Sequence, residues 1–241
     1  MRFRRLREYF HFLRSLFRTN IHLIWGMWKL TAVPHPAITI FGGARIQQDT
    51  EETRIARQLA KMLASEGFSI ITGGGPGIME AANHGAIDFV KECDINNKAC
   101  AQKVVSAGIG VIQLNLENIN PYTQKYIEMP YFFSRKWLLV RYAVGFVIFP
   151  GGFGTMDELS EIITLVQTNK MAKVPIVLID KGFWAPLFEW IQTRALARGL
   201  IGHDDIHLII CVDTAEEAFD ILKMGCKGRE ESISYNGLDK K

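Results

Sequence analysis

The amino-acid sequence predicts an α/β fold, in which a doubly wound parallel sheet follows an N-terminal helical arm. From residue 37 onward, short apolar runs typical of buried strands alternate with segments in which apolar residues recur at helical spacing. Three of these runs end in glycine turns. Because parallel strands joined by right-handed crossovers bring such turns to one edge of the sheet, we expect a ligand site at that edge.

The chain of 241 residues is 48% hydrophobic, which is enough for one substantial core. We expect a basic amphipathic arm over residues 1–36, one α/β domain over residues 37–227 and a polar tail over residues 228–241. The cysteines form no C-x-x-C pair and have no neighbouring histidine at metal-ligand spacing, so we expect reduced thiols, a cytoplasmic protein and no metal site. They are Cys93, Cys100, Cys211 and Cys226.

In the arm, large apolar residues recur at helical spacing with arginines between them, which predicts an amphipathic basic helix or a pair of helices. Residues 1–30 hold seven Lys and Arg side chains and one acidic side chain, Glu8. We expect the face of Trp25 and Trp28 to be buried on the domain or against a second subunit. Contact with a membrane surface is the alternative.

Three other roles of the arm are not expected. Residues 21–33 are too short to span a bilayer and include a lysine. The long basic stretch before them and the lack of a small-residue cleavage site do not fit a signal peptide. No basic patch interleaved with aromatic residues continues into the domain, so nucleic-acid binding is not expected either.

The order of elements follows from the apolar patterns. Strands are expected at residues 37–41, 68–71, 108–114, 146–149, 174–179 and 206–212. Helices are expected around residues 55–63, from residue 78 onward, and around residues 131–142, 159–166, 183–197 and 215–224. Residues 91–103 and 118–122 are polar or rich in turn formers and are expected to be connections.

Residues 150–158, Pro-Gly-Gly-Phe-Gly-Thr-Met-Asp-Glu, connect an expected strand to an expected helix. Three glycines in four positions remove Cβ atoms that would hold a ligand away, and the new helix offers unpaired N–H groups with a partial positive charge. Such a turn suits a phosphate. No Gly-Lys-Ser/Thr follows any glycine cluster and no G-x-G-x-x-G is present, so a single phosphate is expected rather than a magnesium-bound triphosphate.

The same residues also fit a purely structural interpretation. Thr155-x-x-Glu158 matches a capping box, in which the threonine is the N-cap and the glutamate bonds back to its amide. In that case Glu158 would stabilise a helix and have no chemical role.

A second glycine cluster, Gly73-Gly74-Gly75-Pro76-Gly77, follows the expected strand at residues 68–71 and leads into Ile78-Met79-Glu80. A third turn, at Gly42 and Gly43, follows the first strand. Proline near the first turn of a helix costs no hydrogen bond. Several glycine turns that open helices are stronger evidence of a ligand site than one, and we expect them to converge on one crevice.

Together with Arg135-Lys136 upstream, these motifs resemble the LOG family of cytokinin-activating nucleoside 5′-monophosphate phosphoribohydrolases, which are often labelled lysine decarboxylases. The resemblance covers about residues 37–210 and implies a Rossmann-like, nucleotide-binding domain. It implies that Arg135 and Glu158 are catalytic and that a nucleoside monophosphate is the substrate. The residues that it places at the substrate or its phosphate are Gly43, Gly74, Gly75, Gly77, Met79, Glu80, Lys136, Gly151, Gly152, Gly154 and Thr155.

The arm and the sequences Gly-Pro-Gly-Ile-Met-Glu and Asn120-Pro121-Tyr122 are closer to the larger, second type of LOG protein, which implies a dimer or hexamer. Residues 138–140 depart from the compact type, so the resemblance does not imply a base preference. Cleavage of an N-glycosidic bond leaves a positively charged ribose that a carboxylate can stabilise, and it requires neither a metal nor an organic cofactor. The alternative function is a non-catalytic nucleotide carrier or sensor of the same fold.

Overall fold

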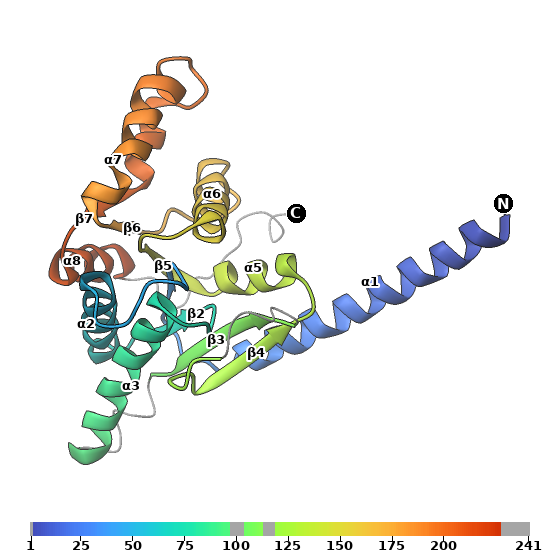
Figure 1. The fold of residues 1–241 in the computed structure, drawn as a ribbon, viewed down its shortest axis with the longest axis horizontal. Coiled ribbons are helices and arrows are strands. Elements are labelled where there is room, and N and C mark those ends of the chain that lie inside the picture. Colours follow the sequence, from blue (N-terminus) through green and yellow to red (C-terminus); the bar gives the residue numbers. More distant parts are fainter. Residues whose placement is uncertain (1, 97–103, 113–118, 228–241) are drawn as a thin grey trace.

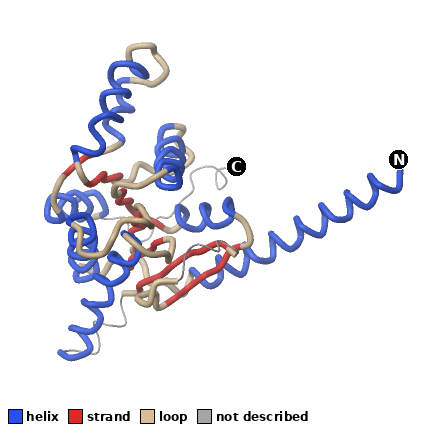
Figure 2. The backbone as a smooth tube through the Cα atoms, viewed as in Figure 1, coloured by secondary structure: helices blue, strands red, loops and turns tan. Residues whose placement is uncertain are grey.

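The computed structural model describes residues 2–96, 104–112 and 119–227 (Figure 1). Seven parallel strands form one sheet in the order β4-β3-β2-β1-β5-β6-β7. Figure 2 shows these strands in red among the blue helices. They are β1 (Ala37–Phe41), β2 (Ser69–Thr72), β3 (Ser106–Val111), β4 (Lys125–Met129), β5 (Ala143–Ile148), β6 (Ile176–Ile179) and β7 (Ile210–Val212). The predicted doubly wound parallel sheet is confirmed.

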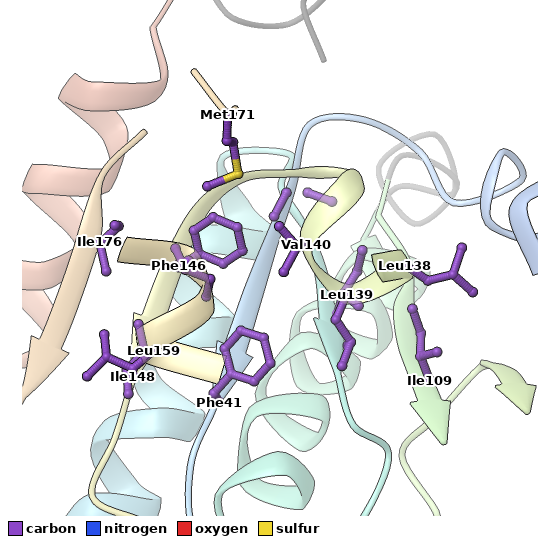
Figure 3. Close-up of a cluster of buried hydrophobic side chains, with 14 of the residues drawn as sticks. Phe41, Ile109, Leu138, Leu139, Val140, Phe146, Ile148, Leu159, Met171 and Ile176 are labelled. Atoms are coloured by element: carbon purple, nitrogen blue, oxygen red, sulfur yellow. The ribbon is translucent and has the colours of Figure 1, made fainter. Parts of the chain in front are cut away.

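Helices cover both faces of the sheet. The helices are α1 (Arg2–Leu30), α2 (Glu51–Ser65), α3 (Ile78–Asn96), α5 (Phe132–Arg141), α6 (Phe153–Gln167), α7 (Lys181–Trp190) and α8 (Ala215–Cys226), with a π-helical segment η1 (Ile191–Leu196) and a 3-10 helix η2 (His203–Leu208). One hydrophobic core joins the sheet to α2, α3 and α8. The other joins the opposite face to the end of α1 and to α5, α6 and α7, and Figure 3 shows part of it around Phe41 and Phe146.

The two cores explain why polar and apolar residues do not alternate along the central strands. All residues of β1 and β5 are buried, because each strand lies between two helical layers. Ile38 packs into the core under α2, whereas Phe41 packs into the core under α5 and α6. Such strands appear in the sequence as continuous apolar runs.

The arm is one helix of 29 residues rather than a helix pair, and its N-terminal part projects away from the sheet (Figure 1). Its C-terminal part packs on β4 and α5 through Gly26 and Leu30, and a Cβ added at Gly26 would be 2.4 Å from the methyl group of Met129. Trp25 and Trp28 are 40% and 69% exposed. Their expected burial on the domain is therefore wrong, because the face that carries Gly26 allows closer packing. Burial against a second subunit stays a prediction.

Several boundaries differ from the sequence prediction. Strand β4 was not predicted, and β7 begins at Ile210 instead of residue 206 because residues 203–208 form the 3-10 helix η2. The carboxylate of Asp205 holds that turn by accepting hydrogen bonds from the amide of Gly202 at 2.8 Å and from Gln167 at 2.6 Å.

Helix α3 extends to Asn96, into the expected loop. Three predicted features lie outside the described residues: the end of the strand expected at residues 108–114, the connection at residues 97–103 with Cys100, and the polar tail. In the described part of the chain, no helix is long and apolar enough to cross a membrane.

Candidate active site

The three glycine turns meet beside the point where the strand order reverses. The chain moves outward in one direction from β1 to β2, β3 and β4, and in the other direction from β5 to β6 and β7. At the carboxyl ends of β1 and β5, the amide of Gly43 donates a hydrogen bond to the carbonyl oxygen of Pro150 at 2.9 Å. The carbonyl oxygen of Gly43 accepts one from the amide of Ile78 at 3.3 Å. Open α/β sheets bind ligands at such a switch point.

The second turn requires glycine at two positions. Gly77 has φ of 70°, and an added Cβ would be 2.3 Å from the carbonyl oxygen of Gly43. Gly74 has φ of 75° and lies against the ring of Tyr126 on β4. Side chains would strain the backbone at both positions, and at Gly77 would also push the first and second turns apart.

A buried network of polar side chains supports this turn from below. Asn83 of α3 is fully buried, and its side-chain oxygen accepts hydrogen bonds from Thr72 at 2.7 Å and from Asn120 at 3.0 Å. The hydroxyl of Thr72 accepts a hydrogen bond from the amide of Gly74 at 2.9 Å, and the amide nitrogen of the Asn120 side chain donates to the carbonyl oxygen of Gly75 at 2.9 Å. Buried networks whose members are all satisfied rigidify the groups that they hold.

The third turn leads directly into α6, whose N-cap is Gly152 and whose first residue is Phe153. Thr155 is therefore the third residue of the helix, and Glu158 is too far along it to bond back to the N-cap. The capping-box interpretation is wrong. Thr155 packs instead against Gly151, where an added Cβ would be 2.1 Å from its hydroxyl oxygen.

Glu158 is a buried carboxyl group in α6, only 8% exposed. Among the described residues its Oε2 atom has no hydrogen-bond partner. Burial raises the pKa of Glu158 to about 7, and the positive charges of Arg135 and then Lys136 oppose that rise. A buried oxygen without a protein partner is costly in a folded protein, so Oε2 of Glu158 is a candidate to contact a ligand.

Arg135 connects three parts of the site. It lies in α5, and its Nε atom donates a hydrogen bond to the carbonyl oxygen of Ile109 on β3 at 2.8 Å. Its guanidinium lies against Gly73 of the second turn, where an added Cβ would be 2.1 Å from one of its terminal nitrogens. Its charge also acts on Glu158. Because one side of the fork is held by Ile109, the remaining N–H groups are oriented rather than free to rotate.

Lys136 has partners other than the predicted phosphate. Its Nζ atom lies 2.5 Å from Asp157 and 3.4 Å from Glu161, both on α6. Burial lowers the pKa of Lys136, but the hydrogen bond with Asp157 and the charges of Glu161 and Glu158 outweigh burial and raise the pKa overall. The structure therefore places the ammonium group with the carboxylates behind Glu158.

Other predicted residues occupy different positions in the site. Met79 is buried, and its sulfur would be 2.7 Å from a Cβ added at Gly73. Glu80 lies in the first turn of α3. No residue of this polar network was predicted to be functional. The only signal in the sequence was Asn83, an asparagine among small apolar residues. Among the described residues, no group of three or more His, Cys, Asp and Glu side chains could hold a metal ion.

The fold and the position of these turns define an open α/β protein whose candidate site lies at the switch point of a parallel sheet. The chain belongs to the family described as "Possible lysine decarboxylase", whose model matches residues 79–222. The predicted membership of the LOG family is thereby confirmed. The chain is 27% identical over 184 residues to the rice (Oryza sativa subsp. japonica) cytokinin riboside 5′-monophosphate phosphoribohydrolase LOG, covering 75% of this chain and 69% of that protein.

A second relative is the pyrimidine/purine nucleotide 5′-monophosphate nucleosidase of Escherichia coli strain K12, 32% identical over 146 residues. The match covers 58% of this chain and 30% of the longer relative. Among solved structures, the molybdenum cofactor carrier protein of Chlamydomonas reinhardtii has a TM-score of 0.54 at 19% identity, over 79% of this chain and 98% of that chain. This likeness shows the shared fold.

Proposed function

We propose that the protein is a nucleoside 5′-monophosphate phosphoribohydrolase, which hydrolyses the N-glycosidic bond of AMP or an N6-modified AMP to the free base and ribose 5-phosphate. The observation that carries the proposal is the buried carboxyl group of Glu158, whose Oε2 atom has no hydrogen-bond partner in the described chain and which lies within the field of Arg135. The names of the rice and Escherichia coli relatives support the general reaction.

The phosphate is proposed to bind at the start of α6. Apart from chain neighbours and the backbone of α6 itself, neither Gly152 nor Gly154 has a heavy atom within 4 Å of the place where a Cβ would stand, so the backbone there is open to close approach. The first amides of a helix have no partner within the helix and lie at its positive end. A phosphate at this turn would accept hydrogen bonds from those amides, with Thr155 beside them.

Glu158 is proposed to act on the ribose. Its ionised carboxylate would stabilise the positive charge that develops at C1′ as the base departs, or accept hydrogen bonds from a ribose hydroxyl and the attacking water. The electrons of the breaking C1′–N bond leave with the base, and water supplies the hydroxyl group at C1′ and a proton for the base. No electron acceptor is required.

Arg135 is proposed to orient the ribose phosphate and to favour the ionised form of Glu158, against the effect of burial. An arginine remains charged throughout the working pH range and has several donors in a fixed plane. Because its Nε atom is already used by Ile109, the terminal nitrogens are the ones directed toward the substrate. Lys136 would assist at one remove, by neutralising Asp157 and Glu161 around Glu158.

The proposal is tested by incubating the purified full chain with a panel of nucleoside 5′-monophosphates and separating the products by chromatography. We expect free base and ribose 5-phosphate in equal amounts from at least one purine nucleotide, and no base from the matching nucleoside. Tight binding of nucleotides without release of base would contradict the proposal and favour the non-catalytic carrier.

A further inference from the structure

The free part of α1 has an apolar face that the domain does not cover. Six large side chains follow one another at intervals of three and four residues, and we call them the apolar stripe: Phe10, Leu13, Phe17, Ile21, Ile24 and Trp28. They are 39–70% exposed. The second three repeat the first three after eleven residues, a period close to that of the α-helix, so the stripe runs nearly straight for about 27 Å.

The domain binds α1 through a different face. The residues of the docked face include Ser15, whose hydroxyl lies 2.8 Å from the hydroxyl of Tyr131, and then Thr19, Gly26 and Leu30, which are buried. At 3.6 residues per turn, the apolar stripe is centred about 170° around the helix from these residues. A flat partner could therefore lie along the stripe while the domain remains attached to the other side.

Positive charge borders the stripe. Arg7, Arg14, Arg18 and Lys29 are exposed, and they lie side by side along one edge of the stripe when they are placed on the helix. Within residues 1–30, seven basic side chains accompany one acidic side chain. At the root of the arm, Trp28 and Lys29 line a hollow of about 490 Å³ together with Lys125 of β4, which continues the mixture of aromatic and cationic groups onto the domain.

We propose that the apolar stripe of α1 lies on an anionic membrane surface, with its side chains inserted at the boundary between headgroups and acyl chains. A long helix with phenylalanine, leucine and tryptophan on one face and arginines beside it is the pattern of helices that lie in the plane of a bilayer. The positive charge of the arm favours an anionic membrane over a second copy of the arm. Two arms packed on one another would bring fourteen basic side chains together, whereas anionic headgroups neutralise them.

The test measures partition of the full chain onto sedimented vesicles. At 0.1 M salt we expect binding to vesicles of phosphatidylcholine with one-third phosphatidylglycerol, and at least about tenfold weaker binding to phosphatidylcholine alone, because each basic side chain near an anionic surface contributes about fivefold. Raising the salt to 1 M shortens the screening length to about 3 Å and should abolish the preference. Brominated lipids should quench part of the tryptophan fluorescence, and Trp28→Phe should reduce that quenching.

A matched pair of double variants separates the stripe from apolar surface in general. Phe10→Glu/Phe17→Glu replaces residues that are 63% and 70% exposed, and Leu200→Glu/Met224→Glu replaces residues that are 65% and 66% exposed on the domain. The first should lose vesicle binding, and the second should bind like the parent chain. Arg14→Gln/Arg18→Gln should weaken binding to anionic vesicles by roughly 25-fold and leave binding to neutral vesicles unchanged.

Three results would overturn the proposal: no partition of the parent chain onto anionic vesicles, equal loss in both double variants, or retention of binding by Phe10→Glu/Phe17→Glu. Light scattering of the same variants identifies the competing occupant. If the stripe variant changes from an oligomer to a monomer and the parent chain does not bind vesicles, the stripe joins two copies of this chain and the membrane proposal is wrong.

Discussion

The Nε atom of Arg135 donates a hydrogen bond to the carbonyl oxygen of Ile109 at 2.8 Å, which links helix α5 to the end of strand β3. This bond consumes one donor of the guanidinium and leaves its terminal nitrogens beside Gly73. The arginine is therefore held by the sheet itself, and its charge acts on Glu158 from a fixed position.

Replacing Arg135 by lysine should show whether geometry or charge matters. A lysine keeps the positive charge but cannot bond to Ile109 and direct a planar pair of donors at the substrate together. We expect kcat/KM to fall by roughly 10²–10³-fold, the scale of losing one positioned electrostatic group. Steady-state assays with the same change at the exposed Arg194 provide the control. Activity of Arg135→Lys within a factor of two of the parent would show that charge alone suffices.

The pH dependence of turnover should follow Glu158. Its pKa is raised to about 7, mainly by burial, so the reactive carboxylate forms only as the pH rises through that value. We expect kcat/KM for AMP to increase up to about pH 7 and then level. Lys136→Met removes a positive charge that lowers this pKa, so it should move the rising limb to higher pH. If the rise in kcat/KM occurs at the same pH in Lys136→Met as in the parent, the group that titrates is not Glu158.

Stability should change with pH in the opposite sense. A carboxyl group with a raised pKa binds its proton more tightly in the folded state, so its stabilising effect is complete below its ordinary value of 4.5 and is lost as the pH rises through about 7. Between these limits the parent chain should lose about 3 kcal/mol of unfolding free energy that Glu158→Gln does not lose. Denaturant unfolding of both proteins at about pH 5 and 8 measures this difference. Parallel pH curves would contradict the assigned pKa.

Two glycine substitutions should separate ligand space from structural need. Gly154 is in α6 with open space at the Cβ position, so Gly154→Ala should keep or raise stability by up to about 1 kcal/mol. The methyl group of the new alanine would stand where the phosphate is proposed to bind. We expect the affinity for AMP to fall roughly tenfold or more, because overpacking costs about 1–3 kcal/mol. Adenosine binding should not change. Gly77→Ala should instead destabilise the fold, because of its positive φ and its contact with Gly43. Calorimetry measures the affinity for AMP. An unchanged affinity in Gly154→Ala would contradict binding of the phosphate at this turn.

The sequence was most informative where a strand is buried on both faces. The runs that became β1, β2, β5 and β6 lie between two helical layers and stand out as apolar, and the glycine turns follow from the need for positive φ or close approach. Strand β4 was missed because it lies at the edge of the sheet, and its burial alternates between Ile127, Glu128 and Met129 over only five residues.

The site was less predictable than the fold, because its geometry depends on contacts between distant segments. Thr155 was a candidate N-cap in the sequence, but α6 begins two residues earlier, at Phe153, and Thr155 packs against Gly151. The role of Asn83 depends on Thr72, Ser106 and Asn120, which come from three other segments. The pairing of Lys136 with Asp157 likewise requires α5 and α6 to be side by side.

The release of adenine from AMP by the parent chain and by Glu158→Gln tests the central claim most directly. Glutamine preserves the size of the side chain and removes the carboxylate charge, so AMP should still bind while single-turnover release of adenine falls by roughly 10²–10⁴-fold. Chromatography of the quenched reaction measures the rate, and calorimetry checks binding. Equal rates of adenine release from the two proteins would contradict a catalytic role for Glu158.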